Sequence, residues 1–216
     1  MRTTIYSSLL FFLLNFPVYS QTGWYEQTLP VSGTIYDIEF LNLYTGFISM
    51  STPAILKTTN GGILWSVIKL IKIFDLDVID STTIYGNGRR DSDGSEIIYR
   101  SFDLGNTWDS TVYSLDFGFR SIHFFNKDTG LVSGAFDLTK IVWRTTNRGH
   151  SLEQLSTTTG LGVLFFLKEK IKGECYGWNV SSGFMSKTTN SGFNWSTPTN
   201  VINGNSGDII SLFFLT

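Results

Sequence analysis

Three closely spaced carboxylates are the first residues of this sequence that could take part in a reaction. Asp75, Asp77 and Asp80 lie within one apolar stretch, and a pair of carboxylates flanking a glycosidic bond is what glycoside hydrolysis requires. Alternate acids along an exposed strand face are usually solvated, however, so a hydrolytic pair is the less favoured interpretation. We therefore assign no catalytic residue.

A second polar cluster, RRDSDGSE at 89–96, places cations and carboxylates around a glycine. Carboxylate oxygens are ligands that Ca²⁺ prefers, but the segment is too short for a helix–loop–helix calcium site. Its simpler interpretation is a polar hairpin loop, with calcium as the minor alternative. We expect no bound metal and no cofactor, and take the loop as the candidate binding surface. Its charged residues are Arg89, Arg90, Asp91, Asp93 and Glu96.

The other reactive residue types are isolated. His123 and His150 have no ligand spacing to any other residue, which argues against zinc. The single cysteine, Cys175, permits no intramolecular disulfide and is expected to be a small buried strand residue. A sialidase-like site needs an arginine cluster, yet only Arg120 and the pair at 89–90 lie in the mature chain outside a repeated position. An arginine-based active site is therefore not expected.

Short strands are the elements that must position these groups. The chain has 216 residues, of which 15% are aromatic and only 16% charged, and small polar residues separate short apolar runs. This composition is typical of an all-β protein. The net charge of −2 gives no electrostatic reason to expect nucleic acid as a partner, since nucleic-acid binding calls for a basic patch.

The N-terminus has the outline of a secretory signal peptide. Residues 1–20 contain one cation, Arg2, followed by an apolar run from Leu9 to Phe16 and a cleavage site between Ser20 and Gln21. The run is far shorter than the roughly 20 residues that a membrane span needs. We therefore expect a mature chain of 21–216 with no transmembrane segment, located outside the cell, in a periplasm or at the cell surface.

One eight-residue turn occurs four times in the chain. It reads TTNGGILW at 58–65, SFDLGNTW at 101–108, TTNRGHSL at 145–152 and TTNSGFNW at 188–195, so the starts are 43, 44 and 43 residues apart. Each copy follows a short apolar strand that ends in a cation: Lys57, Arg100, Arg144 or Lys187. A period near 43 residues indicates a repeat architecture. Three strands before each turn and one after it predict the four-stranded blades of a β-propeller.

Each residue of the turn has an expected structural role. The Asn or Asp side chain should accept backbone N–H groups two residues on, the hydroxyl should hold the start of the turn, and the Gly should adopt positive φ. The final Trp should fill the space between neighbouring blades; the third copy has Leu152 instead. The residues assigned these roles are Thr58, Asn60, Gly62, Trp65, Ser101, Asp103, Gly105, Trp108, Thr145, Asn147, Gly149, Thr188, Asn190, Gly192 and Trp195.

SFDLGNTW agrees at every position with the Asp-box, also called the BNR repeat, of sialidases, sortilin-like receptors and several glycoside hydrolases. The wider unit, which includes DTGLVSG before the third box, most resembles the photosystem II stability and assembly factor family. That resemblance implies a propeller with an assembly-factor-like role, and the same repeat occurs in exported bacterial proteins with no tie to photosynthesis. Because the repeated residues are scaffold, the resemblance is specific for fold rather than for activity.

Together these patterns favour an exported, non-enzymatic propeller that binds another protein. The alternative is a sialidase-like propeller that binds or hydrolyses a glycan. At the chain ends, WYEQTLPV at 24–31 is expected to be the fourth strand of a blade completed by C-terminal strands, and DIISLFFLT at 208–216 resembles only a first strand. We favour a truncated ring over four blades that close with strands left over.

Overall fold

The computed structural model describes residues 26–114, 118–136, 139–155, 163–166, 177–181 and 184–201. The predicted signal segment with its expected cleavage site between Ser20 and Gln21, Cys175, and the segment expected to form a C-terminal strand lie outside these residues. Within them the fold is all-β, as predicted. The described part of the chain contains no helix of the length and apolarity needed to cross a bilayer.

The described strands form four antiparallel sheets of four strands, each in chain order, which confirms the predicted blades. The first blade contains β1 (Ile35–Phe40), β2 (Gly46–Met50), β3 (Ala54–Thr58) and β4 (Ser66–Lys69); the second contains β5 (Asp75–Val78), β6 (Ile84–Arg89), β7 (Glu96–Ser101) and β8 (Asp109–Tyr113); the third contains β9 (Gly118–Phe124), β10 (Gly130–Phe136), β11 (Thr139–Thr145) and β12 (Glu153–Gln154); the fourth contains β13 (Val163–Phe166), β14 (Gly177–Ser181), β15 (Phe184–Thr188) and β16 (Thr199–Asn200).

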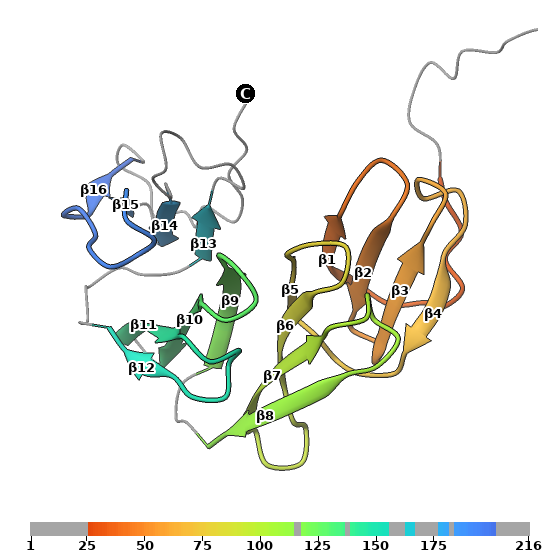
Figure 1. The fold of residues 1–216 in the computed structure, drawn as a ribbon, viewed down its shortest axis with the longest axis horizontal. Helices are drawn as coiled ribbons and strands as arrows, with labels where there is room; N and C mark the ends of the chain where they lie inside the picture. Colours follow the sequence, from red (N-terminus) through yellow and green to blue (C-terminus); the bar gives the residue numbers. More distant parts are fainter. Residues whose placement is uncertain are drawn as a thin grey trace, which may run out of the picture.

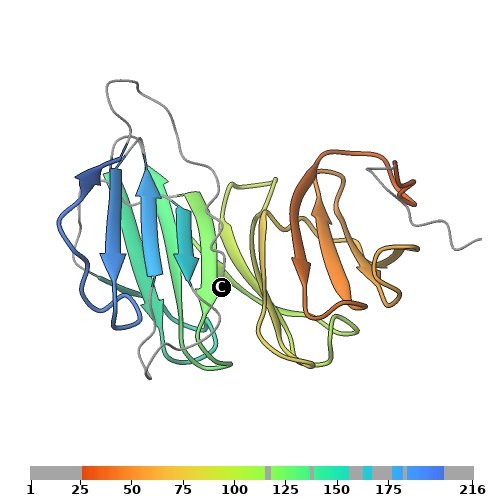
Figure 2. The same cartoon turned by 90° about the horizontal axis from the view of Figure 1, so that it is seen from above.

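The four blades are arranged in an arc (Figure 1). The first strands β1, β5, β9 and β13 lie on the inside of the arc, where neighbours contact each other in that order, and the fourth strands lie on the outside. The view from above shows the first and fourth blades at opposite ends of the molecule (Figure 2). Loops that join strands therefore gather along the two rims of the arc.

The middle strands β2 and β3 of the first blade bury side chains on both faces, because side chains alternate across a strand. In the first blade Ile48 lies opposite Leu56 on one face, while Phe47 lies opposite Lys57 on the other. Phe47 and Ile55 pack with residues of the second blade, including Ile84. The described core is therefore a series of apolar clusters between blades rather than one central cluster.

The last residue of each of the three later boxes lies at one of these joints. Trp108 packs into the cluster between the first and second blades, Leu152 into the one between the second and third, and Trp195 into the one between the third and fourth. Trp65 instead packs on its own blade together with Leu29 and Val31 of the N-terminal segment. The described part of that segment, from residue 26 to 31, contains no strand, so the predicted fourth strand at 24–31 is wrong over those residues.

Two side chains hold the box turn, and each accepts a different backbone N–H group. In the second box the Ser101 hydroxyl donates to Asp103 Oδ1 (2.8 Å) and accepts the N–H of Gly105 (2.8 Å), while Asp103 Oδ1 accepts the N–H of Thr107 (2.8 Å). The same three bonds occur in the boxes that begin at Thr58, Thr145 and Thr188. The Asp or Asn oxygen thus reaches four residues on, not two as expected, because the hydroxyl already takes the nearer N–H.

The glycine of every box has positive φ, and in the three later boxes it also approaches the preceding blade closely. A Cβ atom on Gly192 (φ 76°) would overlap Leu131 Cδ1, and one on Gly149 (φ 72°) would lie 3.0 Å from Ile98 Cγ2. Gly62 has φ 88°, but the nearest atom to its Cβ would be Gln27 Oε1 at 3.6 Å. Only the later boxes therefore need glycine for space as well as for conformation.

Gly192→Ala should destabilise the protein more than Gly62→Ala, by about 1–3 kcal/mol. Both alanines must adopt positive φ, so the difference isolates the overlap with the fully buried Leu131. Urea unfolding of the two variants measures it. If both variants unfolded with the same midpoint and slope, the joint would not require the space that glycine leaves at position 192.

Candidate functional site

The carboxylates on the inner strands hold neighbouring blades together. Asp37 Oδ2 accepts the N–H of Leu76 (2.8 Å), and Asp75 Oδ2 accepts the N–H of Ile122 (2.7 Å). Asp77 Oδ2 likewise accepts the N–H of Phe124. The expectation of a solvated acidic face is wrong for Asp77, which is buried, and Asp75 is only partly exposed. These oxygens satisfy backbone donors that have no partner in their own sheet.

Burial changes the chemistry of these acids. Burial among the inner strands, and then the charge of Asp37, raises the pKa of Asp75 well above the ordinary aspartate range, although the N–H of Ile122 opposes the shift. Asp80 has a different role, since its Oδ1 accepts the N–H groups of Thr82 and Thr83 within a turn. The three acids of the sequence pattern therefore do not converge on one reacting centre.

The candidate binding loop at 89–96 is the hairpin between β6 and β7, and its charges are paired. Arg90 Nη1 lies 3.1 Å from Asp93 Oδ2, and Lys72 Nζ lies 3.1 Å from Asp91 Oδ1. Arg89 Nε donates to the carbonyl of Gly94 (2.9 Å). Four charged residues of this hairpin are exposed and form a mixed-charge surface at one rim of the arc. They are Arg89, Arg90, Asp91 and Asp93.

Glu96 does not belong to that exposed surface. Its side chain is 2% exposed, and Oε2 accepts the N–H of Phe119 in the third blade (2.9 Å), while Oε1 lies 3.5 Å from Arg89 Nε. Burial raises the pKa of Glu96, and the Phe119 N–H and then Arg89 partly offset that shift. Glu96 is thus a further carboxylate that joins two blades.

The histidines lie at blade joints. His123 Nδ1 is 3.4 Å from Asp77 Oδ2, and its ring stacks on Phe166 at 4.5 Å. His150 Nδ1 lies 3.1 Å from Arg100 Nη2. In the described ranges no three His, Cys, Asp or Glu side chains are grouped in a way that could hold a metal ion.

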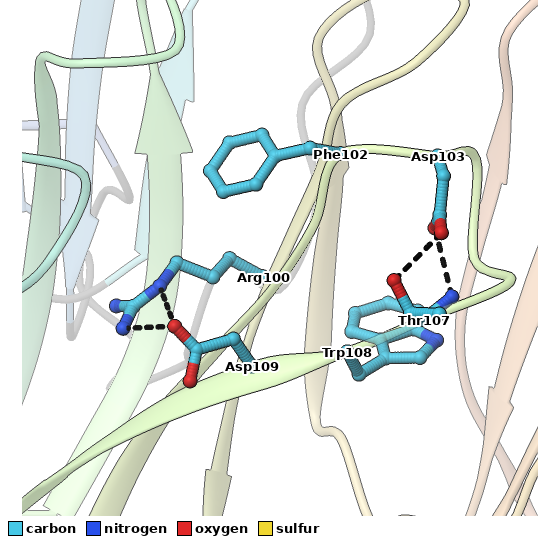
Figure 3. A pocket seen from close by; sticks show the side chains of 6 residues that line it. All are labelled: Arg100, Phe102, Asp103, Thr107, Trp108 and Asp109. Carbon is cyan, nitrogen blue, oxygen red and sulfur yellow. Dashed lines mark hydrogen bonds and ion pairs between the residues drawn. The ribbon is translucent and has the colours of Figure 1, made fainter.

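A hollow of about 260 Å³ lies beside the second box, lined by Arg100, Phe102, Asp103, Thr107, Trp108 and Asp109 (Figure 3). The Arg100 side chain is 2% exposed and donates through Nε (3.0 Å) and Nη2 (2.7 Å) to Asp109 Oδ2. Figure 3 shows this pair on one side of Trp108 and the Asp103–Thr107 pair on the other.

Local donors keep both carboxylates of the hollow ionised. Hydrogen bonds from Thr107 lower the pKa of Asp103, and hydrogen bonds from Arg100 lower that of Asp109. The hollow therefore offers two aromatic side chains beside anionic oxygens, an arrangement suited to binding rather than to proton transfer. The sequence contained a signal for it, since Phe102 stands where the other boxes have Thr59, Thr146 and Thr189.

No protein-family model matches the sequence, and no curated protein matches it either. Solved structures do match. "YCF48 bound to D1 peptide" is similar over 89% of this chain (TM-score 0.60, 18% identity), and YCF48 from Cyanidioschyzon merolae over 83% (TM-score 0.59, 14% identity). A GH74 xyloglucanase from Xanthomonas campestris is similar over 80% (TM-score 0.57, 13% identity).

At these identities the likeness shows the fold, which is that of a β-propeller like those of the photosystem II assembly factor-like and GH74 proteins. This chain spans 63%, 60% and 31% of the three structures, respectively. All three are therefore longer than the region that they share with this chain.

Asp75→Asn should flatten the pH dependence of stability. Because the folded carboxyl holds its proton to a higher pH than the unfolded one, folding of the natural chain weakens as pH rises from about 4 through the raised pKa. Asparagine cannot ionise, and its amide oxygen can still accept the Ile122 N–H. Urea unfolding at pH 4 and pH 8 should show a smaller loss for this variant than for the natural chain.

The matched control for this prediction is Asp91→Asn, the same substitution at an exposed carboxylate. If Asp75→Asn lost as much unfolding free energy between the two pH values as the natural chain does, burial of Asp75 would not be the source of the pH dependence.

Proposed function

We propose that this chain is an exported, non-catalytic propeller that binds a segment of another protein, in the manner of an assembly factor. The observation that carries the proposal is the use of acids at the joints between blades: Asp75, Asp77 and Glu96 each accept a backbone N–H of the next blade. Side chains committed to joints in this way serve shape rather than turnover. The likeness to a peptide-bound propeller over 89% of the chain supports the same conclusion.

The proposed contact surface is the exposed part of the β6–β7 hairpin. Arg89, Arg90, Asp91 and Asp93 present both signs of charge over a short loop, and such a mixed-charge surface can select partners by electrostatic complementarity. The internal pairs are exposed, so each contributes little to folding. The loop can therefore exchange its internal ion pairs for contacts with a partner without unfolding the blade.

A glycan-binding or glycan-hydrolysing propeller is the second candidate. Its support is the likeness to a GH74 xyloglucanase at a similar TM-score, together with the hollow in which Phe102 and Trp108 lie beside Asp103 and Asp109. Aromatic side chains with adjacent carboxylates can hold a sugar by stacking and hydrogen bonding.

Two assays on the same preparation separate these functions. The chain should bind members of an array of extended peptides and should release no product from xyloglucan or from a panel of chromogenic glycosides. Arg90→Ala should weaken peptide binding about two- to fivefold, since an exposed charge contributes up to about 1 kcal/mol. Lys69→Ala, which removes one exposed cation from β4, is the control and should leave binding unchanged.

Turnover of any glycoside would contradict the non-catalytic assignment. Equal effects of Arg90→Ala and Lys69→Ala would contradict the assignment of the hairpin as the contact surface.

A further inference from the structure

The second box differs from the other three copies at two neighbouring positions. Phe102 stands where the other copies have threonine, and Asp103 stands where they have asparagine. Both residues line the hollow of about 260 Å³ beside Trp108 and Asp109 (Figure 3). The other copies make the same hydrogen bonds with asparagine, so the turn itself requires neither the aromatic ring nor the charge.

The guanidinium group that lines the hollow has no donor left for a ligand. Nε and Nη2 of Arg100 donate to Asp109 Oδ2. Nη1 donates to Thr111 Oγ1 (2.9 Å) and to the carbonyl of Arg148 (3.2 Å), and Nη2 also reaches His150 Nδ1 (3.1 Å). Every N–H of Arg100 therefore has a partner, and its side chain is only 2% exposed.

The other side-chain donors of the hollow are used in the same way. Trp108 Nε1 donates to the carbonyl of Gly105 (3.0 Å), and the Thr107 hydroxyl donates to Asp103 Oδ2 (2.6 Å). The lining side chains thus have no donor for an anion. A suitable ligand must itself supply the hydrogen-bond donors.

The two carboxylates retain the capacity to accept such donors. A carboxylate can accept about four hydrogen bonds. Asp103 accepts two through Oδ1 and one through Oδ2, and Asp109 accepts two through Oδ2 and one through Oδ1. Each carboxylate can therefore accept roughly one more, at Asp103 Oδ2 and at Asp109 Oδ1.

The charge of the hollow favours a cationic donor. Arg100 balances Asp109, but no ion pair among the described residues includes Asp103. The hydrogen bonds to Asp103 come from the neutral groups of Ser101 and Thr107. A hydrogen bond between a cation and a carboxylate is stronger than one between neutral groups.

The aromatic side of the hollow also suits a cation. Phe102 is 40% exposed, and the face of an aromatic ring attracts a cation. The guanidinium carbon of Arg148 already lies 5.5 Å from the Phe102 ring centroid, although Asp128 pairs with that cation at 2.8 Å. In the fourth box the Arg144 guanidinium carbon lies 3.5 Å from the Phe193 ring centroid. Aromatic residues of the boxes therefore contact cations elsewhere in this chain.

We propose that this hollow binds a lysine or arginine side chain of a partner protein, with the cation at Asp103 and Asp109 and the apolar stem against Phe102 and Trp108. Such a side chain supplies donors and no acceptor, and its stem can cover aromatic surface. The inference rests on the proposed function only in taking a protein as the occupant. The hairpin at 89–96 lies at the other end of β7, so the two surfaces can be tested separately.

Titration with two blocked peptides, Gly-Ser-Lys-Ser-Gly and the same peptide with glutamine in place of lysine, tests the proposal. The NMR signal of the Trp108 indole N–H, identified by its loss in Trp108→Phe, reports binding at the hollow. The lysine peptide should shift this signal and bind at least fivefold more tightly than the glutamine peptide. Added salt should weaken the binding of the lysine peptide, because the charges involved are exposed.

Asp103→Asn should weaken binding of the lysine peptide about fivefold, since an exposed charge pair contributes up to about that much. The variant should keep the turn, because Asn147 holds the third box and its Nδ2 donates to Ser151 Oγ (2.9 Å). Phe102→Thr, which restores the residue of the other boxes, should weaken binding about threefold. Asn147→Asp, the reverse exchange in the third box, is the control and should leave binding unchanged.

Equal affinities for the two peptides, an unmoved Trp108 signal, or an unchanged affinity in Asp103→Asn would each overturn the proposal. Xyloglucan oligosaccharides that shift the Trp108 signal where the lysine peptide does not would overturn it in favour of the glycan-binding candidate. Array peptides whose binding depends on Arg90 but not on Asp103 would also overturn it, while leaving the proposed function in place.

Discussion

Every other feature of this protein depends on burial of apolar area between successive sheets. A four-stranded sheet with apolar side chains on both faces cannot fold alone, so each blade needs a neighbour on each side. Trp108, Leu152 and Trp195 supply the bulk at three joints, and the glycine before each of them lets the box approach closely. The box therefore packs one sheet against the preceding one.

Apolar packing alone would leave backbone donors of the inner strands unsatisfied at the joints. Asp37, Asp75, Asp77 and Glu96 meet this need, each through a carboxylate oxygen that accepts an N–H of the next blade. The desolvation that raises the pKa of Asp75 and Glu96 is the cost of this arrangement. It follows that these four acid side chains serve assembly of the fold.

The repeat made the architecture predictable because a box and its flanking strands are local in sequence. The joints were not predictable in the same way: Asp75 meets Ile122 and Asp77 meets Phe124, 47 residues further along the chain in both cases. The sequence pattern of alternating acids is the same whether that strand face is solvated or packs against another blade. The burial of Glu96 was hidden for the same reason, since its partner Phe119 belongs to the third blade.

Each of the three later boxes packs against strands of the blade before it, as Gly149 against Ile98 and Gly192 against Leu131 show. At the first blade the described N-terminal segment covers part of the surface that a preceding blade covers elsewhere. Leu29, Val31 and Gln27 provide such cover on the first blade, yet they leave Ile38, Phe40 and Ile63 exposed. The described N-terminal segment therefore replaces a preceding blade over the deeper apolar residues of the first blade but not over β1 or the sixth residue of the box.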